Sequence, residues 1–192
     1  MSKVFDSIFP FIANRNDNQK ISRKDPGNIL DAIDNPDAIS IDILKGLYSD
    51  AIHQKDKLED KAKINVAGIT IAISLILGAS NFLKVISEKY NCSIFSWIVF
   101  ILFVVAVLYL LIAGILAIKV LIHENVVFVV DLKSFAADIA VLRQDYGKRI
   151  SQNRNQNLIR NNSIYTSYEC IRNALICLFI LLVFSAIPYS VA

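Results

Sequence analysis

The side chains that most often carry chemistry in proteins are few in this sequence and lie far apart. His53 and His123 fall in different segments, and the three cysteines, Cys92, Cys170 and Cys177, form no CxxC pair. The sequence contains no HExxH motif, no glycine-rich phosphate loop, no GxSxG motif and no recognisable arrangement of paired carboxylates. We therefore expect no catalytic residue, no metal and no cofactor, and we do not expect an enzyme.

Small and polar residues at helical spacing offer a different chemistry, hydrogen bonding between closely packed helices. Such residues fall on two faces of a helix predicted at 64–86. One face carries Asn65, Gly68, Ala72 and Ala79, and the other carries Thr70, Ser74, Gly78 and Asn81. Small residues allow close approach, and hydroxyl or amide groups bridge membrane helices at about 0.6–2 kcal/mol each. Two such faces predict two neighbours, of which the second is another subunit or water in a pore; alternatively, all eight residues pack the helices of one chain.

Three long runs without a charged residue must position these faces. The longest, 94–118, would rise roughly 37 Å as a helix, enough to cross a hydrocarbon core of about 30 Å. With 55% hydrophobic and only 19% charged residues, the 192-residue chain has the composition of a membrane protein. The sequence therefore predicts an all-α membrane protein with three transmembrane helices, at 64–86, 94–122 and 173–192.

Positive charge flanks these runs unevenly, which predicts their orientation. Residues 55–63 contain four lysines, the loop at 84–93 contains two, and residues 119–172 contain eight lysines and arginines. By the positive-inside rule, the amino terminus is cytoplasmic and the carboxyl terminus is outside. This orientation accounts for the net charge of +3, so we expect the lipid bilayer as a partner and no direct contact with nucleic acid.

The amino-terminal segments are expected to be cytoplasmic. Residues 1–35 are predicted to be irregular. Their apolar patch at 4–12 either touches the membrane surface or a partner, or covers the protein's own helices. Proline and acid at 36–37 predict the start of a stalk helix at 36–63 that can run straight into the first span.

The segment at 123–172 is predicted to contain amphipathic cytoplasmic helices. Its β-branched run at 126–130 is consistent with a strand or with a continuation of the second span. From residue 132 apolar residues recur at helical spacing, which predicts a helix packed against the stalk. The polar run at 151–163 predicts a turn region that is solvated or serves as a docking or lipid-headgroup surface.

One stretch carries a resemblance to a known family. The sequence DKAKINVAG at 60–68, followed by a second span, an amphipathic helix and a last span, resembles the Pycsar membrane effector family and the related SLATT-like transmembrane effectors of bacterial antiphage defence. Members often carry an acid, a lysine and an alanine before the first span, which match Asp60, Lys61 and Ala62. The resemblance covers about residues 45–190. It implies a multi-pass protein that assembles in the inner membrane and impairs it during infection.

The same resemblance implies partners. A homo-oligomer is expected, together with a soluble sensor or second-messenger synthase of the same system, because residues 1–60 are too short for a cyclic-nucleotide-binding domain. Two functions follow as hypotheses: a membrane-impairing defence effector, or a membrane anchor or sensor subunit that recruits a soluble partner. A transporter is disfavoured because the interiors of the predicted spans carry no charge, Lys84 and Lys119 lying near their ends.

Overall fold

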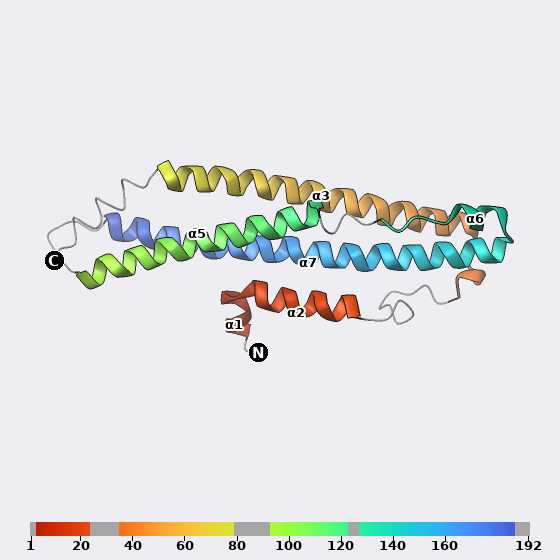
Figure 1. Ribbon diagram of the computed structural model, residues 1–192, viewed down its shortest axis with the longest axis horizontal. Coiled ribbons are helices and arrows are strands. Elements are labelled where there is room, and N and C mark those ends of the chain that lie inside the picture. Colours follow the sequence, from red (N-terminus) through yellow and green to blue (C-terminus); the bar gives the residue numbers. More distant parts are fainter. Residues whose placement is uncertain (1–2, 24–34, 79–92, 123–126, 187–192) are drawn as a thin grey trace.

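The computed structural model describes residues 3–23, 35–78, 93–122 and 127–186, and its regular elements there are all helical. The elements are α1 (Lys3–Ile8), α2 (Pro10–Arg23), the 3-10 turn η1 (Pro36–Ala38), α3 (Ile41–Gly78), α5 (Ser93–Ile122), α6 (Leu132–Ala136) and α7 (Ile139–Ala186). Figure 1 shows α7 running nearly the length of the molecule, with α3 along one side and α2 along the other.

The prediction of one helix from the stalk into the first span is confirmed. Helix α3 continues without a break through both segments, because nothing between them interrupts the helical hydrogen bonds. Its start lies later than predicted. Pro36 opens the short turn η1, and the hydroxyl of Ser40 then accepts a hydrogen bond from the Ile43 N–H at 3.4 Å, capping α3 proper.

The predicted turn region at 151–163 is wrong, because these residues lie inside α7. That helix runs from Ile139 to Ala186 and contains no proline. Asn153, Asn157 and Asn162 find hydrogen-bond partners on neighbouring elements, so a polar composition does not require solvent there. The run at 126–130 was also predicted wrongly, since residues 127–130 form neither strand nor helix.

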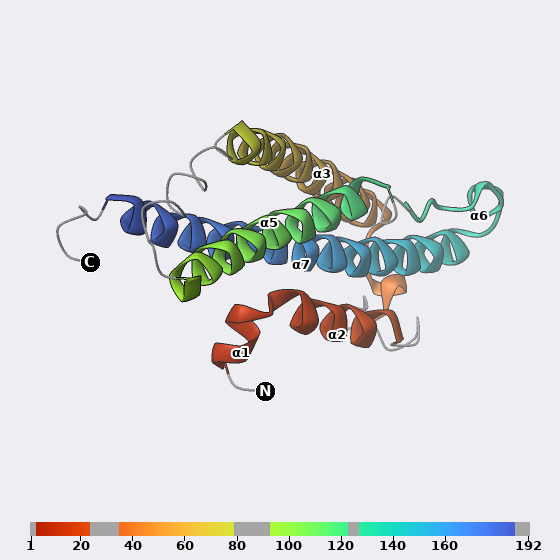
Figure 2. The ribbon, with the colours of Figure 1, turned by 60° about the vertical axis from the view of Figure 1, so that its left-hand side comes forward.

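Three helices, α3, α5 and α7, form an elongated bundle (Figure 2). Several small clusters of apolar side chains lie between them. Near the start of α7, Leu44, Val130, Tyr146 and Ile150 pack together, which confirms the predicted contact between the amphipathic segment and the stalk. Further along, one cluster joins Leu58, Ala62, Val120 and Ile164, and another joins Ile69, Ile76, Leu110, Ala113, Cys170 and Ala174. Because α7 contributes to each of these clusters, it is the central element of the fold.

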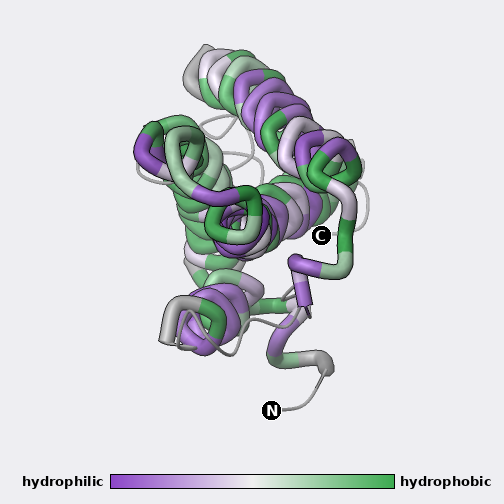
Figure 3. The backbone as a smooth tube through the Cα atoms, turned by 90° about the vertical axis from the view of Figure 1, so that its right-hand side faces the viewer, coloured by the Kyte–Doolittle hydropathy of each residue, from purple (hydrophilic) through white to green (hydrophobic). Residues whose placement is uncertain are grey.

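Helices α1 and α2 correct the prediction of an irregular segment at 1–35. Residues 3–8 and 10–23 are helical, and Pro10 opens α2 at a position where its missing N–H costs nothing. Viewed along the bundle, α2 lies beside the three long helices (Figure 3). It packs against α7, so the amino-terminal segment covers the protein's own helices. Residues 24–34 lie outside the described residues.

Two helices are long and apolar enough to cross a membrane, α5 over Ser96–Ile122 and α7 within Ile139–Phe184. Only 22% of the most apolar window of each is buried, whereas the core helix of a soluble protein is mostly buried. Large side chains such as Trp97, Ile115 and Phe179 are exposed. The first predicted span is described only as far as Gly78, so three spans with a cytoplasmic amino terminus remain a prediction.

Candidate functional site: a buried polar track on α7

Helix α7 buries a row of polar side chains between its neighbours, which we call the polar track. It consists of Ser151, Asn153, Asn157, Arg160, Ser163, Thr166 and Ser167. Most of these residues recur at spacings of three and four, so they share one side of the helix. Since buried polar groups are costly unless they are hydrogen-bonded, each partner of the track is a specific requirement of the fold.

Asn157 and Arg160 form the centre of the polar track. Arg160 is 1% exposed, and its Nη1 donates a hydrogen bond of 2.7 Å to Oδ1 of Asn157. The Nδ2 of Asn157 donates in turn to the carbonyl of Ala51 on α3, also at 2.7 Å. A guanidinium is always charged in proteins, so Asn157 both links two helices and orients a buried cation.

Asn153 holds the irregular segment 127–131 against α7. Its Oδ1 accepts the N–H of Phe128 at 2.9 Å, and its Nδ2 donates to the carbonyl of the same residue at 3.0 Å. The Tyr48 hydroxyl donates to that carbonyl as well, at 3.4 Å. The side chain of Asn153 therefore replaces the backbone partner that a residue outside regular structure lacks.

Asp145 anchors the start of α6 near the end of the bundle. Its Oδ2 accepts the Asp131 N–H at 2.7 Å and the Ser134 hydroxyl at 3.0 Å, and its Oδ1 accepts Nε of Arg149 at 3.0 Å. Partial burial alone would raise the pKa of Asp145, but these hydrogen bonds and the charge of Arg149 outweigh burial and lower that pKa. The carboxylate is thus held ionised as a structural acceptor.

At the other end of the polar track, hydroxyl and amide groups join all three long helices. The Ser167 hydroxyl donates to the carbonyl of Ala113 on α5 at 3.0 Å and accepts Nδ2 of Asn65 on α3 at 3.4 Å. Toward α2, Asn18 accepts from Asn162 at 3.0 Å and donates to Ser163 of the polar track at 3.5 Å. The polar track therefore contacts every helix that packs on α7 in this region.

The structure separates the residues predicted to form packing faces on α3. Asn65 is buried, and Ala72 is half-buried beside the cluster of Leu110 and Ala113. By contrast, Gly68, Thr70 and Ser74 are exposed, and a Cβ added at Gly68 would meet no atom within 4 Å. Gly78 is the last residue of α3, and Ala79 and Asn81 lie outside the described residues.

The three residues of the family-like motif also differ in their exposure. Asp60 is exposed and accepts a hydrogen bond from Nζ of Lys63 at 2.8 Å, and Lys61 is exposed. Ala62 is fully buried against Val120 and Ile164. Of the three motif residues, only the alanine contributes to the packing of the chain.

The chemistry available to the polar track is hydrogen bonding rather than proton transfer. Its members are amides, hydroxyls and one guanidinium, none of which titrates near neutral pH. Within the described ranges, no group of three His, Cys, Asp or Glu side chains is placed to hold a metal ion. Cys170 is buried and Cys177 half-buried, both as free thiols, while Cys92 lies outside the described residues.

Comparison with known proteins adds no relative. The chain matches no protein-family model, and no curated protein and no solved structure is significantly similar to it.

Sequence reasoning missed the polar track, although a signal for it exists. Five of its members recur at intervals of four, three, three and four residues, which is the period of one helix face: Asn153, Asn157, Arg160, Ser163 and Ser167. The composition of the run outweighed its spacing in the prediction of a turn.

Proposed function

We propose that this protein is a membrane-embedded effector of a bacterial antiviral defence system, which oligomerises in the inner membrane and impairs membrane integrity when triggered. The proposal that the protein is embedded in a membrane rests on one observation, the exposed apolar surface of α5 and of the part of α7 beyond Arg172. Water is an unfavourable solvent for a continuous surface of this kind, and lipid is a favourable one. The antiviral part rests on the resemblance around Asp60, Lys61 and Ala62.

The exposed side of α3 supports oligomerisation. Gly68 leaves open space on this side, so another helix can approach the backbone closely. The hydroxyls of Thr70 and Ser74 donate to the carbonyls of Val66 and Thr70, each at 2.8 Å, so neither hydroxyl is unsatisfied in an apolar environment. This surface is thus compatible with lipid in one state and with a second copy in another.

The polar track supports a mechanism for triggering. It runs along one continuous helix toward the apolar segment that follows Arg172. We call the opposite end of the bundle, which contains η1, α6 and the start of α7, the polar end. A soluble sensor or a second messenger that binds the polar end would act on a rigid rod whose hydrogen bonds have few alternative partners. Rotation or splaying of the helices would then open a leak.

The first experiment measures membrane potential with a voltage-sensitive dye in bacteria that express the protein with its neighbouring genes, before and after phage infection. We expect loss of potential only after infection. Gly68→Leu should prevent this loss, while Gly46→Leu, the matched change at another open position of α3, should preserve it. Equal depolarisation by both variants, at equal membrane abundance, would contradict a role for this side of α3.

A second candidate function, an anchor or sensor subunit that recruits a soluble partner, is favoured by a separate observation. The polar end of the bundle exposes apolar side chains, among them Leu132 at 84%, Phe135 at 54% and Ile139 at 51% exposure. An unchanged potential after infection, with a soluble protein that co-purifies with the wild type and is lost with Leu132→Glu, would favour this function over the first.

A further inference from the structure

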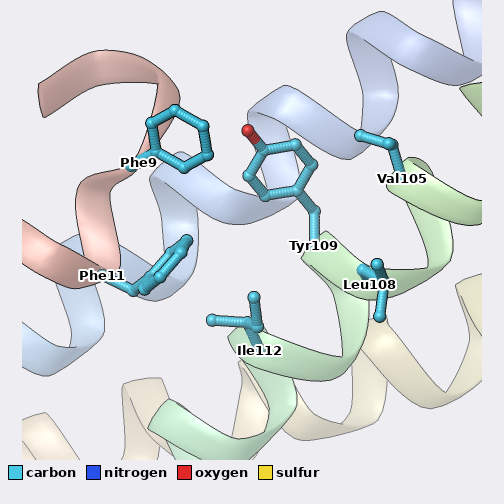
Figure 4. Close-up of a pocket in the computed structure, with 6 residues that line it drawn as sticks. All are labelled: Phe9, Phe11, Val105, Leu108, Tyr109 and Ile112. Atoms are coloured by element: carbon cyan, nitrogen blue, oxygen red, sulfur yellow. The ribbon is translucent and has the colours of Figure 1, made fainter. Parts of the chain in front are cut away.

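A cavity of about 390 Å³ lies between α1, α5 and α7. Its polar wall is formed by Ser7, Arg172 and Asn173, and its apolar wall includes Ile8, Val105 and Ile176. An adjoining cavity of about 180 Å³ shares Val105 and Tyr109 with the first and is otherwise lined by Phe9, Phe11, Leu108 and Ile112. Figure 4 shows Phe9 and Phe11 on one side of this second cavity and the residues of α5 on the other.

The polar wall presents one cation with unused hydrogen-bonding capacity. Nη2 of Arg172 donates to the Ser7 hydroxyl at 3.0 Å, and Nε and Nη2 both donate to Oδ1 of Asn173, at 3.3 and 3.2 Å. Among the described residues, no carboxylate lies within ion-pair distance of Arg172, and its Nη1 has no partner. A guanidinium in this state matches the oxygens of a phosphate group.

The two walls together resemble the two ends of a phospholipid. The guanidinium lies at the first cavity, and the second cavity continues from it between aromatic and aliphatic side chains. The outer surface of α5 beside them is apolar, with Leu108 and Ile101 exposed, so a lipid in the surrounding bilayer has direct access. A free anion would use the polar wall alone and would leave the apolar wall empty.

We propose that this pair of cavities binds one anionic phospholipid, with its phosphate on Arg172 and an acyl chain against Ile8, Val105 and Ile176, which lie toward the apolar end of α7. The lipid would rest on α1 and α7 at once, since Ser7 accepts from Arg172 and its carbonyl accepts from Asn173 at 2.9 Å. The proposal rests on the membrane insertion assumed above, but not on membrane impairment.

The test is lipid binding by the full chain, purified in a neutral detergent and titrated with short-chain phosphatidylglycerol or phosphatidylcholine, with bound lipid counted by native mass spectrometry. We expect one phosphatidylglycerol per chain and weaker retention of phosphatidylcholine, whose choline cation opposes Arg172. Arg172→Gln should weaken phosphatidylglycerol binding at least about tenfold, because one charge-assisted contact is lost. Lys148→Gln, which removes an exposed cation elsewhere on α7, should leave binding unchanged.

A second variant keeps the test decisive if Arg172→Gln fails to fold. Val105→Phe fills the region shared by both cavities without removing charge, and it should also reduce binding at least about tenfold. Equal binding by wild type and both variants would overturn the proposal. Displacement of the lipid by inorganic phosphate at equal concentration would assign the site to a free anion and would likewise overturn it. Because binding is measured without infection, its outcome is independent of the depolarisation experiment.

Discussion

The hydrogen bonds of Asn157 make the strongest prediction about stability. Asn157→Leu keeps the branching of the side chain at Cγ but removes an acceptor for Arg160 and the donor to the Ala51 carbonyl. A hydrogen bond to a buried charged group contributes about 1.5–3 kcal/mol, and a neutral one about 0.5–1.5 kcal/mol. The expected loss is therefore about 3 kcal/mol, which corresponds to a Tm lower by about 6–12 °C in a chain of this size.

The assay is thermal unfolding of the purified protein in detergent, followed by circular dichroism. Asn155→Leu is the matched control, because Asn155 lies on the same helix and its side chain makes no hydrogen bond within the described residues. The double variant Asn157→Leu with Arg160→Met should recover much of the loss, since it removes the buried cation along with its acceptor. A Tm of Asn157→Leu within about 1 °C of the wild type, or a double variant less stable than the sum of its single changes, would refute the reasoning.

Two further predictions concern the polar end of the bundle. The pKa of Asp145 is lowered on folding. The contacts of its carboxylate therefore stabilise residues 127–136 fully at a pH above 3.8, the ordinary pKa of this group, and this stabilisation is lost as the pH falls through the lowered pKa. Pepsin should therefore cut this segment faster below about pH 4, and Asp145→Asn should remove that dependence on pH. Gly147→Ala would place a Cβ 3.0 Å from Cβ of Pro36 and should lower Tm relative to Gly46→Ala, whose new methyl meets no atom within 4 Å. A higher Tm for Gly147→Ala in differential scanning fluorimetry would show that Pro36 moves away at little cost.

Helices with strong local signals could be predicted from the sequence. The charge-free run at 94–118 required a long helix, and α5 spans Ser93–Ile122. The stalk was predicted to join the first span because no glycine or proline lies between residues 52 and 64, and α3 is continuous there. The apolar spacing from residue 132 also predicted its contact with the stalk, although α6 and α7 are separated at Ala137.

What the sequence could not supply was the identity of partners far away in the chain. A polar run is ordinarily solvated, and residues 151–163 become a buried helix only because Ala51, Phe128 and Asn18 supply hydrogen-bond partners. The same holds for α2, whose buried Asn18 gives no local sign of its partners Asn162 and Ser163 on α7. Polar side chains that pair across more than a hundred residues leave no periodic apolar signal in either segment.

The level at which α7 becomes free of charge has a mechanical consequence for the surrounding lipid. Ala62 of α3 packs beside Ile164 of α7, yet the last charge of α3 is Lys63, whereas α7 keeps charge as far as Arg172, about 12 Å farther along the bundle. In a bilayer, the two sides of the protein would therefore demand different hydrocarbon thicknesses. Lipids next to α7 would have to thin or tilt where those next to α3 do not. Such a one-sided mismatch would deform the bilayer even before any trigger. The elastic energy of this deformation would fall when neighbouring copies of the protein place their α7 sides, where the bilayer is thinned, next to each other.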